Sequence, residues 1–500
     1  MESWFTRTDL LLSALFVGLA IVLILYATAQ WGPGLTTDSV RYMDSAAHIA
    51  AGDGLVTGVP DGVKRPLTEW PPGFPLVLAP DAVAAWARWV QALLFGCCTL
   101  MAFAFVRWAG GSRPGAALAA TLTCCGGGMV LQFVVVSSET LFLPLQLGGI
   151  WAVSAWMNGR RESVLWLAGG LLCSATLTRY VGQGAALAMI LLVALTAWHS
   201  GRHRLRAPAI ILMASQIALI AWLLRNVLEA DTVAQRTMAP QPIEFDWVLN
   251  VWRVATLWFW PAEWTRWFRH PATLFLLLAG VAALRKRTAP ESAARARAVA
   301  SVAGWWITGY LCLMFATDFL TPRDQDLDVR MMLPVMLPIV CVLGLALPSG
   351  RNWRVWCASA LAIFVCAVGA IRTAAQAQEL HESGFAFGSR AWHQSPMLDA
   401  ARKLPANAVL ASNQADAVFW HLDRPCLPLP RAGDEGRDHT CLDAERVQRF
   451  HQARGDRQVT YVLRFHQSWR WDAPVEDSQH ELKLERVADF SDGTLFRISE

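Results

Sequence analysis

Apolar residues occur along this chain in blocks of about 14 to 22 residues that carry almost no charge. Short basic or aromatic segments separate the blocks, and this pattern is typical of helices that cross a membrane. The predicted spans cover residues 10–29, 88–106, 115–136, 140–157, 163–178, 181–198, 208–226, 271–284, 298–316, 331–348 and 354–371. The sequence therefore predicts a mainly α, polytopic membrane protein with about eleven transmembrane helices.

The first block also has features of a secretory signal. Arg7 precedes it, and Ala27-Thr28-Ala29 is similar to a cleavage site. The apolar run is longer than the usual hydrophobic region of a signal peptide, which favours an uncleaved span. Cleavage is left open, and the other spans are the same in either case.

Basic residues between the spans predict the topology. If odd-numbered spans run outward, every inside connection is basic and has very few carboxylates. These connections contain Arg107, Arg113, Arg160, Arg161, Arg202, Arg204, Arg206, Arg285, Lys286, Arg287, Arg295, Arg297, Arg351 and Arg354. We therefore expect a cytoplasmic N-terminus. Because the net charge of +4 lies mostly between spans, it indicates no nucleic-acid partner.

The tail is predicted to lie outside as a small α/β domain over residues 380–500, after a membrane domain over 1–375. Residues 408–413 and 459–465 read as strands, and 442–454 read as a helix between them. Cys426 and Cys441 lie in a loop-rich part of this domain. Because the compartment is outside the membrane, we expect them to form a disulfide.

The first outside loop, 30–87, opens with a predicted helix that lies on the membrane surface. Asp38 stands at its start, and Gly52 and Gly54 follow its end. Asp38 has two interpretations. It can simply cap the helix. Alternatively, the helix dipole keeps its carboxylate ionised, ready to act as a general base.

Further charged and polar residues fall at the outer ends of predicted spans or in outer loops. They are Lys64, Arg65, Glu139, Arg179, Arg225, Asn226 and Arg330. Each one alone is compatible with an ordinary interfacial anchor or with phospholipid contact. Five charged residues, Asp38, Glu139, Arg179, Arg225 and Arg330, end on the same side in this topology, so they can ring one phosphate-binding cavity. The tryptophan-rich segment 246–271 is either an aromatic belt or a lid.

Several motifs together resemble the GT-C membrane glycosyltransferases, in the branch of the lipid A aminoarabinose transferase and the protein O-mannosyltransferases. They are "DSVRYMDSAAHIAAGDG", "RPLTEWPPGFPLVLA", "SSETLFLPL", "LTRYVG" and the arginine before "MLPVMLP". The resemblance covers residues 1 to about 372. Many members have a second acid after the first, and here that position is Ser39. The usual Arg-Tyr pair is Arg330-Met331.

The resemblance implies a sugar transferase at the outer face of a bacterial inner membrane. Its donor would be a hexose or pentose on a polyprenyl phosphate, and its acceptor a lipid, glycan or protein. Asp38 takes the position of the acid that activates the acceptor, with inversion at the anomeric carbon. Cations then neutralise the leaving phosphate, and the need for a divalent metal is left open. The donor-phosphate candidates are Lys64, Arg65, Arg225 and Arg330; the acceptor or cavity candidates are Arg41, Tyr42, Glu69, Glu139, Arg179 and Asn226.

Three other classes compete with this reading. A transporter or flippase of lipid-linked glycans usually has charges deep within its spans and paired repeats, and neither is visible in the sequence. An enzyme like the O-antigen ligases also needs outer arginines, but no acidic helix directly after its first span. A scaffold without activity leaves the outer arginines unexplained.

Overall fold

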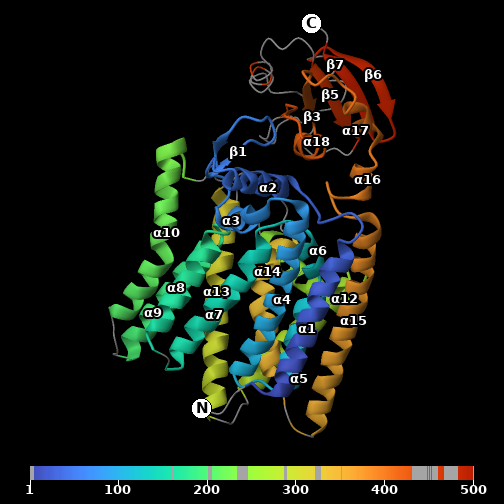
Figure 1. The fold of residues 1–500 in the computed structure, drawn as a ribbon. Coiled ribbons are helices and arrows are strands. Elements are labelled where there is room, and N and C mark those ends of the chain that lie inside the picture. The colour runs from blue at the N-terminus through green and yellow to red at the C-terminus, as the bar shows by residue number, and fades with distance from the viewer. Residues whose placement is uncertain are drawn as a thin grey trace. The chain divides into compact units, whose positions relative to one another are not determined.

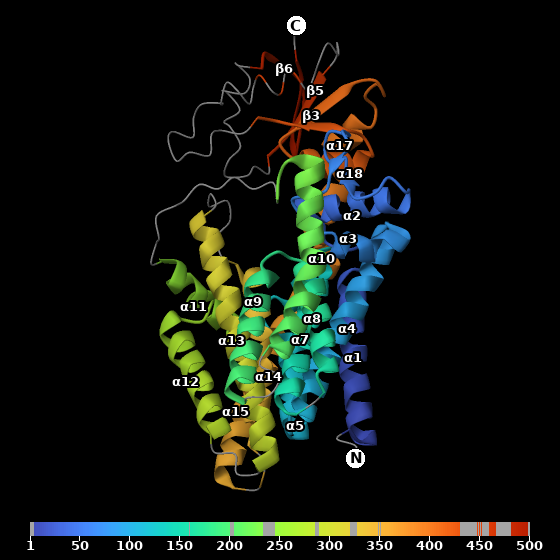
Figure 2. The ribbon, with the colours of Figure 1, turned by 90° about the vertical axis from the view of Figure 1, so that its left-hand side faces the viewer.

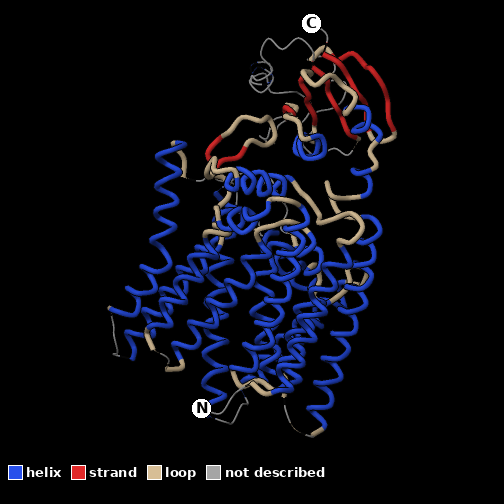
Figure 3. The backbone as a smooth tube through the Cα atoms, viewed as in Figure 1, coloured by secondary structure: helices blue, strands red, loops and turns tan. Residues whose placement is uncertain are grey.

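The computed structural model of the protein describes residues 5–159, 161–200, 205–233, 246–285, 290–320, 328–348, 350, 352–430, 448, 450, 452, 460–466 and 482–498. The chain divides into two compact units. Unit 1 comprises residues 1–30, 68–77 and 84–382, and unit 2 comprises residues 31–67, 78–83 and 383–500. Figures 1 and 2 show the helices of unit 1, and Figure 3 draws the strands in red; the described strands all belong to unit 2.

Unit 1 is a helical bundle. Neighbours include α1 with α4, α7 with α8, and α9 with α13. Nine helices of the described ranges are long and apolar enough to cross a membrane, so the chain is a multi-pass membrane protein. The helices of the unit are α1 (Arg7–Ala27), α3 (Gly73–Leu78), α4 (Ala84–Trp108), α5 (Arg113–Cys125), α6 (Met129–Val134), α7 (Glu139–Met157), α8 (Ser163–Thr176), α9 (Gly182–Ser200), α10 (Arg206–Ala230), α11 (Asp246–Phe259), α12 (Arg266–Arg285), α13 (Pro290–Leu320), α14 (Val329–Ala346) and α15 (Trp353–Ser383).

The predicted span 115–136 is two helices, α5 and α6, rather than one. Three consecutive glycines, 126–128, separate them. Gly128 has φ +84°, which few other residues adopt easily. A Cβ at Gly126 would lie 2.4 Å from the Trp258 ring. The helix is therefore interrupted where the buried Trp258 ring reaches its backbone.

Two prolines lie inside α14. Pro338 has no N–H, so the carbonyl of Pro334, four residues earlier, loses its usual helical partner. The buried Gln146 of α7 donates from Nε2 to that carbonyl at 3.1 Å. A polar residue inside a predicted span therefore has a structural role, because it satisfies a backbone group that water cannot reach.

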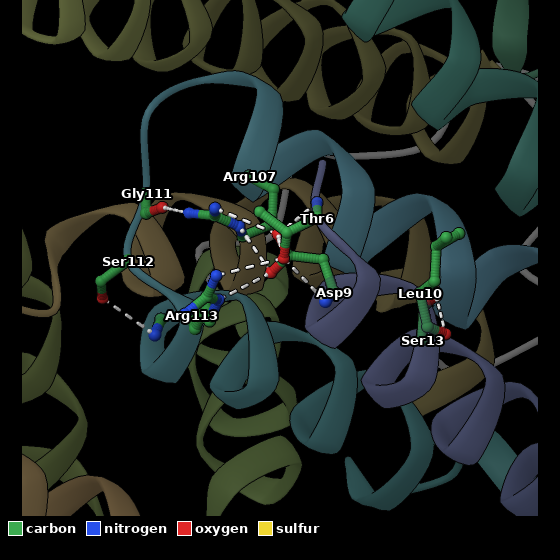
Figure 4. Close-up of polar contacts among 9 residues, drawn as sticks. Thr6, Asp9, Leu10, Ser13, Arg107, Gly111, Ser112 and Arg113 are labelled. Carbon is green, nitrogen blue, oxygen red and sulfur yellow. Dashed lines mark hydrogen bonds and ion pairs between the residues drawn. The ribbon is translucent and has the colours of Figure 1, made fainter. Parts of the chain in front are cut away.

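Figure 4 shows an ion-pair network around the buried Asp9 at the start of α1. Thr6 caps the helix, and its N–H and hydroxyl donate to Asp9, both at 2.9 Å. Arg107 and Arg113 each donate from Nε to Asp9 Oδ1, at 3.1 and 3.2 Å. Since Asp9 is fully buried, its charge needs these partners. The network ties α1 to the end of α4 and the start of α5.

Unit 2 contains a five-stranded sheet with the order β4-β3-β5-β7-β6. Strand β3 pairs in parallel with β4 and β5, whereas β5–β7 and β7–β6 are antiparallel. The elements are α2 (Thr37–Ala50), β1 (Val56–Thr57), β2 (Arg65–Pro66), η1 (Ala79–Asp81), α16 (Arg390–His393), α17 (Pro396–Ala401), β3 (Val409–Ser412), α18 (Ala415–Leu422), β4 (Cys426–Pro428), β5 (Thr460–Phe465), β6 (Leu484–Phe490) and β7 (Gly493–Ile498).

The two predicted strands of the tail are confirmed as β3 and β5. The helix predicted over 442–454 falls, apart from positions 448, 450 and 452, outside the described residues. Cys441 also lies outside them, so its disulfide with the buried Cys426 stays a prediction. The domain boundary near 375–380 likewise stays a prediction.

The first loop contributes to unit 2 through contacts with the tail. Arg41 of α2 donates from Nε to Asp416 Oδ1 of α18 at 3.2 Å. The carbonyl of Pro60 accepts from the N–H of Cys426 at 2.8 Å, and the carbonyl of Leu35 accepts from Phe387. Residues more than 300 positions apart therefore fold together.

Candidate active site

Glu139, Arg179 and Arg330 form an ion cluster in unit 1. Glu139 opens α7, Arg179 lies in the turn between α8 and α9, and Arg330 lies in the first turn of α14. Arg179 forms an ion pair with Glu139 through Nη1, and Arg330 Nε lies 3.4 Å from Glu139 Oε1. The three helix ends that the sequence predicts on one side are thus brought into contact by their side chains.

The cluster combines a buried acid with partly accessible cations. The Glu139 side chain is only 2% exposed, whereas those of Arg179 and Arg330 are 22% and 26% exposed. A carboxylate at the first position of α7 is favoured by the helix dipole. The three groups carry a net charge of +1, with half-exposed Asp328 at the edge, 3.7 Å from Arg330 Nε. Such a cluster can present guanidinium groups to an anion without an unpaired buried charge.

Local structure holds each arginine in place. Asp328 caps α14 by accepting from the N–H of Met331 at 2.9 Å. The Arg179 N–H bonds to the carbonyl of Ala175 at 2.9 Å, and its Nη1 donates to Ser138 Oγ at 3.2 Å. The buried Tyr310 of α13 donates to the carbonyl of Met331 at 2.9 Å. Tyr310 was missed at the sequence level, because within its apolar helix it resembles any packing residue.

Tyr180, next to Arg179, joins three further segments. Its hydroxyl donates to the carbonyl of Thr68 at 3.1 Å and accepts from Trp222 Nε1 at 2.8 Å. Asn226 Nδ2 lies 3.5 Å from the same hydroxyl and donates to the carbonyl of Val233 at 3.0 Å. The Tyr180 hydroxyl thus donates one hydrogen bond and faces two donors, which uses its full hydrogen-bonding capacity. The turn after α8 is thereby tied to the first loop and to α10.

Arg225 lies next to Asn226 and contacts other side chains of the same helix. Its guanidinium lies 5.1 Å from the Trp222 ring centroid, and it pairs with Glu229 one turn later. Its Nη1 also donates to Asn226 Oδ1 at 3.3 Å. Of the two predicted residues, Asn226 thus lies close to Tyr180, and Arg225 contacts Trp222 and Asn226. Trp222 was missed, although its spacing from both on one helix is the signal that identifies it.

Asp38 lies in the first turn of α2, in unit 2, and is half-buried. The helix cap is Thr36 rather than Asp38. Thr36 Oγ1 accepts from the Ser39 N–H, and Ser39 Oγ accepts from the Thr36 N–H at 2.9 Å. This reciprocal pair is a capping box. The capping interpretation of Asp38 is therefore wrong, and Ser39 has a structural reason to be polar.

Lys64 and Arg65 each pair with an aspartate of the same loop. Lys64 Nζ donates to Asp53 at 2.8 Å, and Arg65 binds Asp61 through two nitrogens at 3.0 and 2.6 Å. Hydrogen bonds from Lys64 and then from His48 lower the pKa of Asp53. Burial alone would raise the pKa of Asp61, but the hydrogen bonds from Arg65 and the Val63 N–H outweigh it and lower that pKa. Both cations therefore help to fold the loop.

The remaining candidates of the first loop are distributed between the units. Tyr42 is buried in α2, and Arg41 pairs with Asp416 as described above. Asp44 accepts from Thr57 Oγ1 and the Gly58 N–H at 2.9 and 2.7 Å, so it joins α2 to the strand β1. Glu69 belongs to unit 1, is half-buried, and follows Thr68, the acceptor for Tyr180.

The tryptophan-rich segment 246–271 comprises the whole of α11, the connection after it and the start of α12. Trp258 and Trp260 are buried, and Trp260 Nε1 donates to Thr273 at 3.1 Å. Trp267 is largely exposed. The interpretation of segment 246–271 as an aromatic belt or a lid stays a prediction. Over the described ranges, no three His, Cys, Asp or Glu side chains are grouped so that they could hold a metal ion.

Comparison of the sequence with protein-family models gives no match. Comparison with curated proteins also gives none. Comparison of the fold does give matches. ArnT from Cupriavidus metallidurans bound to undecaprenyl phosphate superposes with a TM-score of 0.60 and 14% identity, covering 99% of both chains. The same protein in the apo state gives 0.59 and 14% identity over 97% of both chains.

A second relative in fold is archaeal. The oligosaccharyltransferase AglB from Archaeoglobus fulgidus, in complex with an inhibitory peptide and a dolichol-phosphate, gives a TM-score of 0.51. It is 11% identical and covers 92% of this chain and 70% of the other. The two proteins share the GT-C architecture. The resemblance predicted from the motifs is thus confirmed at the level of the fold: this multi-pass membrane protein has the fold of the GT-C glycosyltransferases.

Proposed function

We propose that the protein transfers a sugar from a polyprenyl-phosphate donor to an acceptor on the outer face of a bacterial inner membrane. The carrying observation is the Glu139–Arg179–Arg330 cluster, which offers two guanidinium groups at helix ends of a GT-C bundle. The full-length likeness to ArnT, whose structure holds undecaprenyl phosphate, supports a donor of this class.

Arg330 and Arg179 are the leading candidates to bind the donor phosphate. A phosphate that approaches them can share guanidinium N–H groups with Glu139, because these groups form bidentate contacts with both carboxylates and phosphates. Arg225 is the next candidate. Lys64 and Arg65 rank lower than the sequence alone suggests, because each is matched by its own aspartate, whereas Arg179 and Arg330 share the single carboxylate of Glu139.

Asp38 supplies the base in this proposal. Its carboxylate takes the proton of the acceptor hydroxyl or amine while the acceptor atom attacks the anomeric carbon. The bond from that carbon to the phosphate oxygen breaks, and the polyprenyl phosphate leaves with the electron pair. Cations neutralise the charge that develops on it. One displacement of this kind inverts the configuration of the anomeric carbon.

The test compares two isosteric changes of an acid to its amide. Asp38→Asn removes the base, whereas Asp423→Asn alters an exposed turn residue with φ +51°, where asparagine is equally well accommodated. We expect Asp38→Asn to lower sugar transfer at least 100-fold, with unchanged expression and donor binding, and Asp423→Asn to behave as the parent chain. Retained turnover in Asp38→Asn overturns the mechanism.

Two other outcomes would reassign the function. If the chain moves a lipid-linked glycan across vesicles without breaking its bond to phosphate, it is a flippase. If it transfers preassembled glycans but no single sugar, it acts like the O-antigen ligases. Mass spectrometry of donor and product distinguishes these cases, since only sugar transfer releases a polyprenyl phosphate while adding one sugar mass to the acceptor.

A further inference from the structure

An apolar cavity of about 520 Å³ lies between α12, α13 and α14 of unit 1. Its α13 wall is made of small residues that recur at helical spacing, including Ala296, Ala300, Ala303 and Gly304. Leucine, isoleucine and valine side chains of α12 and α14 form the opposite walls. The volume is in the range of ligand-binding cavities rather than of packing defects.

The cavity lies in the half of the bundle away from Glu139. Helix α14 starts beside Glu139, at Arg330, and its lining residues 339–343 come nine to thirteen positions later, roughly 14 to 20 Å along the helix. On α13 the lining runs from Ala293 to Ile307, about 21 Å of helix. That length is more than half of a hydrocarbon core about 30 Å thick and suits one acyl chain.

Arg297 is the charged residue that lines the cavity. It is exposed and lies near the start of α13, where the helix emerges from the apolar region. Arg295, two residues earlier, donates instead to the carbonyl of Trp108 at 3.3 Å, so it faces a different neighbour. A cation near one end of an acyl-sized apolar groove is complementary to a lipid with an anionic headgroup.

We infer that this groove binds an anionic glycerophospholipid, with an acyl chain along α13 and the headgroup phosphate at Arg297. The site would lie in the leaflet opposite the Glu139 cluster. It is independent of the proposed sugar transfer, because it shares no residue with that site. It would let the lipid composition of the membrane stabilise the α12–α13–α14 side of the bundle.

The test measures retained lipid on the detergent-purified full chain by native mass spectrometry. Phosphatidylglycerol and phosphatidylcholine with identical acyl chains are offered in equal amounts. We expect phosphatidylglycerol to be retained preferentially. Arg297→Gln should reduce that preference roughly five-fold, and Arg297→Lys should restore most of it. Arg206→Gln, which changes a largely exposed arginine paired with Glu162, should leave it unchanged.

A second variant tests the groove itself. Gly304→Leu places bulk in the cavity, and no atom lies within 4 Å of a Cβ built at this position, so the bundle can accept it. Gly170→Leu is the matched control, because Gly170 of α8 is an exposed helical glycine with equally open surroundings. We expect the first variant to lose retained phosphatidylglycerol and the second to keep it.

Three results would overturn the assignment. The first is an unchanged lipid preference in Arg297→Gln together with unchanged retention in Gly304→Leu. The second is undecaprenyl phosphate as the lipid that Gly304→Leu displaces, which would make the groove part of the donor site. The third is a dimer that Gly304→Leu converts to monomers, which would assign the groove to a second copy of the chain.

Discussion

At the scale of single residues, charged side chains of this protein carry both structure and proposed chemistry. Glu139 is buried and contacted by two arginines, whereas the pair of Arg225 and Glu229 is partly open to solvent. A buried carboxylate that loses its charge leaves its partners uncompensated, and this costs far more than the loss of an exposed pair.

Glu139→Gln should therefore lower the free energy of unfolding by about 3 kcal/mol. Glu229→Gln is the matched control, since Glu229 is 50% exposed and also pairs with one arginine; it should cost under about 1 kcal/mol. Unfolding of both variants in mixed detergent micelles measures the difference. Equal stability of the two would show that the Glu139 cluster does not support the fold.

Single residues also show which contacts could be predicted from the sequence and which could not. The motifs predicted Asp38, Glu139, Arg179, Arg225 and Arg330 as one group, and the structure brings Glu139, Arg179 and Arg330 of that group into contact. The motifs could not show that Lys64 and Arg65 have aspartate partners. In the sequence, Asp53 and Asp61 look the same whether they pair with a cation or are only solvated in the loop. Ser39 appeared as a missing acid, and only the structure identifies it as half of a capping box.

At the scale of elements, apolar periodicity placed helices correctly but could not detect interruptions inside them. The break between α5 and α6 depends on Trp258, more than 130 positions from the glycines that admit its ring. The two prolines of α14 likewise look like breakers in the sequence. They are accommodated within one helix because Gln146 of another helix satisfies the carbonyl of Pro334.

This last contact predicts a compensating pair of substitutions. Gln146→Leu should destabilise the bundle by about 1 to 2 kcal/mol, because the Pro334 carbonyl loses its donor. Pro338→Ala restores an N–H four residues after that carbonyl, so the double variant should recover most of the loss. Unfolding of the two single variants and the double variant gives the coupling energy. Simple additivity of the two changes would exclude this role for Gln146.

A partly buried histidine of helix α18, His421, leads us to expect that the stability of the protein depends on pH. Burial lowers the pKa of His421 below its ordinary value of 6.5, and the hydrogen bond to the Phe387 carbonyl opposes this only in part. The unfolded chain then binds the proton more readily than the folded one. The contribution of neutral His421 is therefore fully present above about pH 6.5 and is lost as the pH falls toward the lowered value.

The measurement is the thermal unfolding midpoint of the full chain between pH 8 and 5. The midpoint of the parent chain should fall on acidification. The midpoint of His421→Asn should fall less steeply, because asparagine keeps a donor for the Phe387 carbonyl but has no titrating ring. His466→Asn is the control, because His466 is an exposed histidine of the same unit; its midpoint should depend on pH as that of the parent chain does. A parallel pH dependence in parent and His421→Asn would refute the assignment.

At the scale of the whole molecule, each compact unit is built from segments that are not contiguous in the sequence. Segment 31–67 precedes almost all of the bundle, yet it belongs to the same unit as residues 383–500. Periodicity reports local structure, so it could identify the bundle and the strands of the tail. The association of the first loop with the tail depends on single contacts, such as Arg41 with Asp416, which no local pattern predicts.

A chain that ends at Glu382 should still insert as a membrane bundle, because unit 1 is complete at that residue. Residues 31–67 would lose Asp416, Cys426 and Phe387 as partners, so limited proteolysis should cut this loop faster than in the full chain. Membrane extraction and protease mapping test both statements. Failure to insert would place the domain boundary elsewhere.

If the proposed function is right, the protein carries a sugar-linked polyprenyl phosphate as its donor. The most direct measurement is mass spectrometry of lipid that co-purifies with the full chain and with Arg330→Gln. We expect a sugar-linked polyprenyl phosphate on the parent chain, whose mass identifies the sugar, and roughly ten-fold less of it on the variant. Absence of any polyprenyl phosphate from the parent chain, or equal amounts on both, would contradict it.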